Sequence, residues 1–198
     1  MSREEQEMFI AYLLKDMDAC KFGVLLALLT GIRIGELCAL RWESISMREK
    51  TIRITATMQR LRNMDTDGEN RTRIVIGPPK SDTSTRTIPM TEYAAELCGR
   101  MDPHCDAAFV LTGSTNYIEP RTLQYRLNRY VRDCGLEGVH FHTLRHTFAT
   151  RCVEVGFEIK SLSEILGHAT TTITLERYVH SSLELKRNNM NKLVEVGF

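Results

Sequence analysis

The chain alternates between two kinds of hydrophobic pattern. Near the N-terminus and over the second half, apolar residues recur every three or four positions, which is typical of amphipathic helices. Residues 20–30 are almost wholly apolar and are followed by Gly31, so we expect a buried helix that ends at this glycine. The helices that this pattern predicts cover residues 4–17, 20–30, 34–40, 91–101, 121–134, 142–155, 161–166, 170–180 and 182–194.

A strand-type pattern occupies the region between residues 51 and 89. Residues 51–56 alternate polar and apolar side chains, as a half-buried β-strand does. Residues 72–76 and 85–89 predict two further strands, separated by turn-forming residues, and Pro89 indicates a strand end or edge. We therefore expect an α+β fold, mostly α-helical, with one small antiparallel three-stranded sheet. A length of 198 residues suits a single domain.

The charge of the chain is nearly balanced but unevenly distributed. A net charge of +1 gives no argument for a polyanionic partner, yet 19 of the 26 basic residues are Arg. Arginine is the side chain best suited to forked hydrogen bonding with phosphate. Residues 48–89 and 120–151 each carry a net charge of +4, whereas residues 1–20 carry −3. This distribution fits a surface that faces a polyanion, and equally well fits solvated helix and strand faces.

The cysteines and the hydropathy exclude several classes of protein. The six cysteines contain no Cys-x-x-Cys pair and mostly lie in helical patterns, which predicts buried free thiols in a reducing cytoplasm. A zinc site at Cys98, His104 and Cys105 is an alternative, but no second ligand pair has suitable spacing. No segment reaches the ~18 apolar residues of a membrane span. Residues 1–7 are too acidic and polar for a signal peptide.

The segment His142-Thr143-Leu144-Arg145-His146 is the sharpest local signal for chemistry. On a helix, His142 and Arg145 point to the same side, and His146 lies one turn from His142. The segment begins near a predicted helix N-terminus, where free N–H groups favour anions. It is therefore a candidate anion cradle, although a surface histidine beside a structural arginine would show the same pattern.

Five other positions are candidates for a site of phosphate chemistry. Glu36, three residues after Arg33, can orient that guanidinium by a charge-assisted bond. Tyr178 lies ten residues after His168, and a tyrosine becomes a useful nucleophile only when a base or cationic surroundings assist it. Lys80, in the turn between two predicted strands, can deliver a proton into a cleft. Taken singly, these residues also fit a surface ion pair, a packed tyrosine and a solvated lysine.

Taken together and in chain order, these positions resemble the catalytic domain of the tyrosine recombinases, the phage-integrase family. The matching segments are residues 30–37, residues 80–81 with 84–89, residues 142–150, and Leu166-Gly167-His168 with its tyrosine after nine intervening residues. They span residues 30 to 180, which is nearly the whole chain. Within the family, the chain looks most like the integrases of bacterial conjugative transposons and phages.

The resemblance implies a single catalytic domain over residues 1–198. Its core would cover about 1–180, and 181–198 would form a C-terminal helical tail. In the family such a tail packs on a neighbouring protomer, and packing on its own domain is the alternative. We expect the helical core-binding domain that precedes this one in the family to lie outside this chain.

The implied activity is the cutting and rejoining of DNA strands by transesterification, with no metal or cofactor. The tyrosine attacks phosphorus, forms a 3′-phosphotyrosine and frees a 5′-hydroxyl, and a partner strand reverses the step. Such site-specific recombination would integrate or excise a mobile element. The residues that the resemblance assigns to catalysis are Arg33, Lys80, His142, Arg145, His168 and Tyr178.

The role of each residue matches a charge or a proton that phosphoryl transfer has to manage. The two arginines and His168 would bind the non-bridging oxygens, since stabilising charge there is most of the catalysis. His142 would act in acid/base chemistry, and Lys80 would protonate the leaving 5′-oxygen. Glu36 and His146 are expected to support these groups rather than to react.

Double-stranded DNA is the implied partner. The chain would associate with itself on DNA, as a tetramer in the synaptic complex, and would be a monomer without DNA. The implied location is the bacterial cytoplasm, at the nucleoid when the protein is bound to DNA. The best candidates for DNA contact share one predicted helix at spacings of three to five, and are Arg121, Arg126, Arg129 and Arg132.

Other functions remain open on the sequence alone. A type IB topoisomerase or a hairpin-resolving enzyme would use the same covalent chemistry to a different end. A non-catalytic DNA-binding module could keep the fold, but binding alone requires no positioned tyrosine, lysine and two histidines.

Overall fold

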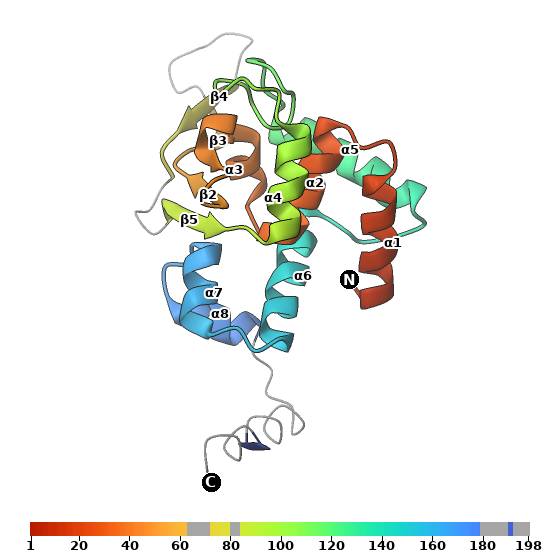
Figure 1. Ribbon diagram of the computed structural model, residues 1–198, viewed down its shortest axis with the longest axis vertical. Helices are drawn as coiled ribbons and strands as arrows, with labels where there is room; N and C mark the ends of the chain where they lie inside the picture. The colour runs from red at the N-terminus through yellow and green to blue at the C-terminus, as the bar shows by residue number, and fades with distance from the viewer. Residues whose placement is uncertain (63–71, 80–83, 179–189, 192–198) are drawn as a thin grey trace.

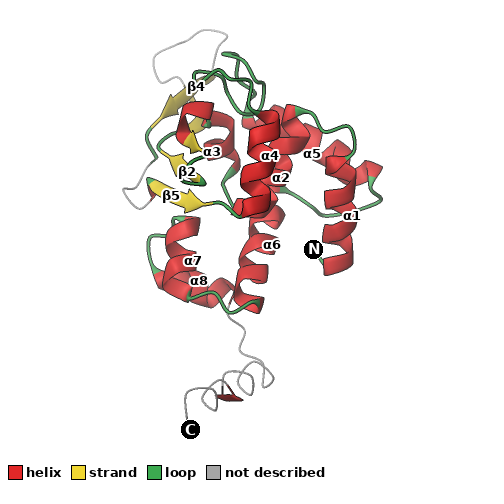
Figure 2. Ribbon diagram, in the orientation of Figure 1, coloured by secondary structure: helices red, strands yellow, loops and turns green. Residues whose placement is uncertain are grey.

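Helices dominate the computed structural model, which describes residues 1–62, 72–79, 84–178 and 190–191 (Figures 1 and 2). The helices are α1 (Arg3–Leu14), α2 (Ala19–Thr30), α3 (Ile34–Ala39), α4 (Glu92–Met101), α5 (Pro120–Asp133), α6 (Phe141–Glu154), α7 (Ile159–Leu166) and α8 (Thr171–Tyr178). The strands are β1 (Ile45–Ser46), β2 (Thr51–Ile54), β3 (Thr57–Arg62), β4 (Thr72–Gly77) and β5 (Arg86–Pro89), and a 3₁₀ turn, η1, covers Trp42–Ser44. The mostly helical α+β class is therefore confirmed. The predicted helix over 182–194 lies almost entirely outside the described residues.

Helix α2 forms the centre of the main core, as its apolar run predicts. Nine of its twelve residues are buried, and it packs against α1, α4, α5 and α6. It ends at Gly31, whose φ of 66° is left-handed. A Cβ at this position would lie 2.6 Å from Phe148 and 2.9 Å from Leu166, so both the backbone angle and the close packing require glycine. The chain then turns directly into α3.

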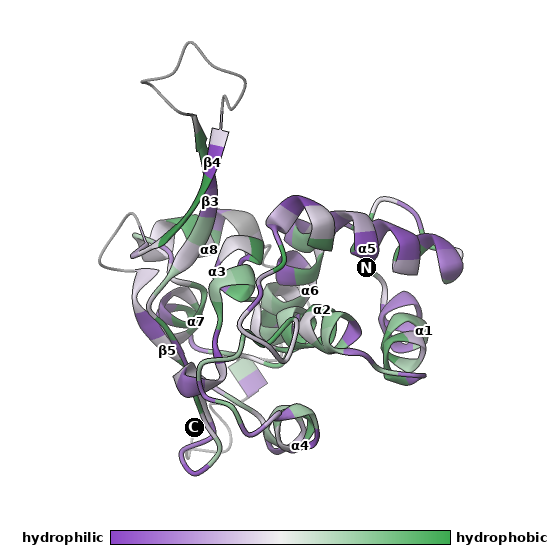
Figure 3. Cartoon of the chain, turned by 90° about the horizontal axis from the view of Figure 1, so that it is seen from above, coloured by the Kyte–Doolittle hydropathy of each residue, from purple (hydrophilic) through white to green (hydrophobic). Residues whose placement is uncertain are grey.

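The strands divide between two sheets, where the sequence predicted one. Strands β1, β2 and β5 form a three-stranded antiparallel sheet, and β3 and β4 form a separate antiparallel hairpin. The strand predicted at 72–76 thus pairs with β3, which the pattern missed because Met58 and Leu61 are three residues apart and break the period of two. The hairpin projects from the body on the side away from α4 (Figure 3). Pro89 ends β5, which lies at the sheet edge as expected.

Helices α7 and α8 form a small second core against α6 (Figure 1). Its buried members are Ala149, Cys152, Leu162, Leu166 and Tyr178. Helix α7 also contacts β5. This small unit therefore places the C-terminal end of α7 beside the sheet and beside the start of α3.

The cysteines are free thiols, four of them buried. Cys98 lies in the core with no exposed surface, whereas Cys105 is exposed, so these two do not share an environment. Within the described ranges, no group of three or more His, Cys, Asp or Glu side chains is placed to hold a metal ion. No helix among these residues is long and apolar enough to cross a membrane.

Candidate active site

Arg33 stands at the start of α3, immediately after the turn made by Gly31. Its Nη1 lies 2.8 Å from Oε1 of Glu36, and its Nη2 donates to the carbonyl of Gly167 at 2.6 Å. The side chain is 37% exposed, so part of it still faces outward although both terminal nitrogens are bonded. Gly167 lies 134 positions away, so the tertiary fold creates this contact.

Arg145 lies on the second turn of α6 and is only 4% exposed. Its Nη1 donates to the carbonyl of Gly31 at 2.7 Å, and its Nη2 donates to the carbonyl of Leu166 at 2.6 Å. Burial, together with the nearby charges of Arg33 and Arg86, lowers the pKa of Arg145 to about 9. The guanidinium is therefore still charged at neutral pH, in a place that favours an incoming anion.

Glu36 is buried and shared between two arginines, one of which the sequence analysis did not single out. Arg86, on β5, donates Nη1 to Oε1 and Nη2 to Oε2 of Glu36, each at 2.9 Å. Burial opposes ionisation of Glu36, but the bonds from Arg86 and Arg33 outweigh it and lower the pKa of this carboxyl. The alternating strand pattern could have indicated that Arg86 is buried, since it lies on the same inward strand face as Ile88.

His168 follows the left-handed residue Gly167, which ends α7. Its Nδ1 is 2.8 Å from the hydroxyl of Thr174, and its ring is stacked on that of Tyr178 at 6.3 Å and 4°. Thr174 is fully buried and was also missed, although it lies one helical turn before Tyr178. The threonine fixes the orientation of the imidazole.

Tyr178 ends α8, and its ring contacts two histidines, one of which contacts a third. Besides His168, His146 contacts it edge-on with ring centroids 5.2 Å apart, and His142 contacts His146 at 4.6 Å. The tyrosine is 7% exposed, and its hydroxyl is buried without a hydrogen-bond partner among the described residues. His146 thus lies directly against Tyr178, closer than the supporting position expected for it.

The structure therefore brings together five of the six positions predicted for catalysis, from α3, α6, α8 and the end of α7. Lys80 lies outside the described residues. Within the described part of the chain, three guanidiniums and one carboxylate meet at the end of α7, beside His168, whose ring stacks on Tyr178. Such a set can bind a phosphate diester and present an oxygen nucleophile to it.

The arginines of α5 form a different environment. Arg121 bonds the hydroxyl of Tyr125 at 3.2 and 3.0 Å, and Arg129 lies 3.8 Å from Asp133. Arg126 donates to the sulfur of Cys20 at 3.0 Å. All four predicted DNA-contact arginines are exposed. Helix α5 itself lies apart from α7 and α8 (Figure 1).

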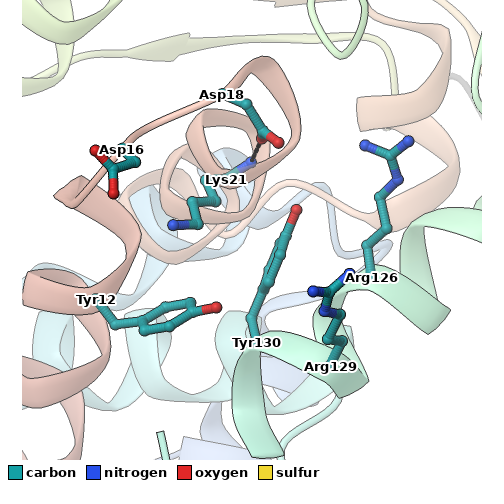
Figure 4. A pocket seen from close by; sticks show the side chains of 7 residues that line it. All are labelled: Tyr12, Asp16, Asp18, Lys21, Arg126, Arg129 and Tyr130. Atoms are coloured by element: carbon teal, nitrogen blue, oxygen red, sulfur yellow. Dashed lines mark hydrogen bonds between the residues drawn. The ribbon is translucent and has the colours of Figure 1, made fainter. Parts of the chain in front are cut away.

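Two of these arginines line a pocket of about 520 Å³ between α5 and the start of α2 (Figure 4). Its side chains carry both signs of charge beside two aromatic rings. They are Tyr12, Asp16, Asp18, Lys21, Arg126, Arg129 and Tyr130.

A family model described as the phage integrase family matches residues 4–184. The chain belongs to this family. Among its relatives, a tyrosine recombinase XerC-like protein of Caldanaerobacter subterraneus subsp. tengcongensis is 28% identical over 188 residues, covering 85% of this chain and 47% of the relative. The transposase from transposon Tn916 of Enterococcus faecalis is 27% identical, covering 98% of this chain and 52% of the relative. The chain thus spans about half the length of these curated relatives.

The phage integrase family fold is also evident from solved structures. The integrase of transposon Tn1549, in complex with a circular intermediate DNA, superposes with a TM-score of 0.76 at 24% identity. The match covers 98% of this chain and 65% of that one. This likeness agrees with the mostly helical fold and small antiparallel sheets described above.

Proposed function

We propose that this chain is the catalytic domain of a site-specific DNA recombinase or integrase. It would cut and rejoin DNA strands through a 3′-phosphotyrosine during integration or excision of a mobile element. The observation that carries the proposal is the meeting of Arg33, Arg145 and His168 with Tyr178, from elements distant in the chain. Membership of the phage integrase family supports the same interpretation.

In this proposal the scissile phosphate binds where the two arginines converge. Arg33 and Arg145 donate to its non-bridging oxygens, and His168 adds a third donor. Because both guanidiniums are already oriented by backbone carbonyls, little reorganisation is needed as charge develops in the transition state. The electrostatic work is then done by side chains of the chain itself, and the mechanism requires no divalent metal or cofactor.

The proposed chemical step is a transesterification. The oxygen of Tyr178 forms a bond to phosphorus while the bond from phosphorus to the 5′-oxygen breaks, so the number of phosphodiester bonds is conserved. His142 accepts the phenolic proton or binds a phosphate oxygen, and Lys80 protonates the leaving 5′-oxygen. Since the hydroxyl of Tyr178 is buried, α8 has to shift before the oxygen reaches a DNA phosphate.

The partners in this proposal are double-stranded DNA and further copies of the chain. The exposed arginines of α5 would follow the DNA backbone, and a tetramer would form in the synaptic complex from a monomer without DNA. In this proposal a core-binding domain would precede this domain in the parent protein. The predicted C-terminal tail, residues 181–198, lies almost entirely outside the described residues. The proposal also places the protein at the nucleoid during recombination.

A trapping experiment tests the activity. The full chain is incubated with a pool of nicked duplexes from the DNA that flanks its gene, so that cleavage beside a nick releases a short strand and prevents religation. We expect a DNA–protein adduct that survives denaturation and disappears in Tyr178→Phe. Tyr93→Phe, which alters an exposed tyrosine on α4, is the matched control and keeps the adduct.

The alternative functions predict other results. DNA binding without an adduct from the wild-type chain would indicate a non-catalytic binding module. An adduct that persists in Tyr178→Phe would assign the nucleophile elsewhere. With an adduct in hand, plasmids that carry two sites distinguish strand exchange from the supercoil relaxation or hairpin formation of related enzymes.

A further inference from the structure

The C-terminal end of α7 is held by three arginines. The last carbonyl groups of a helix have no partner within the helix, and cations near them are favoured by the helix dipole. Three consecutive carbonyls here each accept a bond from a different arginine. These are Arg86 Nε to Ile165 at 2.6 Å, Arg145 Nη2 to Leu166 at 2.6 Å and Arg33 Nη2 to Gly167 at 2.6 Å.

Arg86 has no part in the chemistry proposed above, yet it is the most completely bonded of the three. Its side chain is 6% exposed. It donates to both oxygens of Glu36, to the carbonyl of Ile165 and to the carbonyl of Ser84 at 3.0 Å. It also fills the space beside Gly167, where a Cβ would lie 3.0 Å from it. Arg86 thus connects β5, α3 and the end of α7.

We propose that Arg86 is a positioning residue that keeps Arg33 extended toward the phosphate, an inference that rests on the proposed function. Glu36 Oε1 accepts from both Arg33 and Arg86, whereas Oε2 accepts from Arg86 and from the backbone N–H of Arg33. Arg86 therefore occupies the sites on Glu36 that a second bond from the Arg33 guanidinium would need.

Removing Arg86 has two consequences for the site. Glu36 becomes available for a two-bond pair with Arg33, which is the favoured geometry of an arginine and a carboxylate, and this pulls the guanidinium back. The summed charge of the three arginines and Glu36 also falls from +2 to +1, which weakens the attraction for a phosphate. The first effect acts on the cleavage step through Arg33, whereas the second acts directly on the phosphate.

The test uses the nicked duplex on which the wild-type chain forms its adduct. Arg86→Met should slow adduct formation in a single turnover by about 100-fold, the loss expected from misplacing a catalytic group by about 1 Å. DNA affinity should change by less than about threefold, because the α5 arginines remain. Arg86→Lys keeps the charge but not the fork and should recover part of the rate.

Two comparisons separate positioning from a loss of stability. Ile88→Ala removes a buried side chain from the same strand and should lower the melting temperature without slowing cleavage. In an Arg33→Lys background, Arg86→Met should slow cleavage by less than about threefold, because the two residues act as a unit. If Arg86→Met does not fold, Arg86→Lys is measured instead in the wild-type and Arg33→Lys backgrounds. It should again slow cleavage less in the Arg33→Lys background than in the wild type.

A failure of this inference can be distinguished from a failure of the proposed function. Without a wild-type adduct, the proposed function itself is wrong. If the adduct forms and the Arg86 variants cleave at the wild-type rate, or slow cleavage by the same factor in both backgrounds, Arg86 does not position Arg33. If Ile88→Ala with an equal loss of stability slows cleavage equally, Arg86 is merely structural.

Discussion

Two groups of arginines in this protein differ in how they are held. At the end of α7, Arg86 and Arg145 are buried and Arg33 is partly exposed, and each is bonded to backbone carbonyls of other elements. On α5 the four arginines are exposed, and Arg121 and Arg129 each bond a side chain one turn away on the same helix. The first group is fixed by buried tertiary contacts. The second group is exposed, although Arg126 also donates to Cys20 Sγ on α2.

This difference matches two kinds of work on one polyanion. A guanidinium that stabilises a transition state has to be oriented before the reaction. The free-energy cost of removing it from water is tolerated because burial holds it in that orientation. A guanidinium that follows a DNA backbone needs length and freedom more than fixed geometry, and its contribution is screened by salt. Under the proposed function, the same residue type would therefore serve catalysis in one place and binding in the other.

The largest effect is expected for Arg145→Met. The change leaves the carbonyls of Gly31 and Leu166 without their buried donor, which should lower the free energy of unfolding by about 2–4 kcal/mol. Loss of an oriented donor should also slow adduct formation by about 100- to 1,000-fold. Urea unfolding and single-turnover trapping measure the two effects. Full activity in this variant would contradict the proposed catalytic role of Arg145.

A smaller effect concerns the pH dependence of stability. Folding lowers the pKa of Glu36 below the ordinary value of 4.5, so below that value the unfolded chain binds more protons. The stability from this carboxylate is therefore present above about pH 4.5 and is lost as pH falls through the folded pKa. Glu36→Gln should be less stable than the wild type at pH 7, with the gap narrowing as the pH falls below about 4.5.

Urea unfolding across this pH range provides the measurement. Glu158→Gln is the control, because that carboxyl also has a lowered pKa but is exposed at the N-cap of α7. It should change the pH profile of stability without altering cleavage. A constant gap between Glu36→Gln and the wild type at all pH values would show that the ion pairs of Glu36 add no pH-dependent stability.

The smallest effects are expected on α5. Arg121→Ala, Arg129→Ala and Arg132→Ala should each change the free energy of unfolding by less than about 0.5 kcal/mol, because these side chains are exposed. Each should weaken DNA binding similarly for all sequences, and each phosphate that the variant no longer neutralises should reduce the salt slope by about 1. Arg100→Ala on α4 is the control, and an equal loss of affinity there would remove the special role of α5.

Much of the candidate site could be predicted from the sequence. The segments around Arg33, Arg145, His168 and Tyr178 carry short-range patterns, and their order along the chain led to the family. Arg86 and Thr174 could not be weighed in the same way. In a four-residue strand and a short helix, the sequence pattern indicates only weakly which side chains face inward. It does not show which groups Arg86 and Thr174 contact, because those partners lie elsewhere in the sequence.

The sequence by itself determined the helical character, the buried α2 and the glycine stop at Gly31, because these depend on local periodicity and backbone freedom. Only the tertiary structure decided that β3 and β4 form their own hairpin and that three arginines meet at one helix end. Contacts such as that between Arg33 and Gly167 join residues 134 positions apart. They arise from the packing of α3, α6 and α7, which no local pattern encodes.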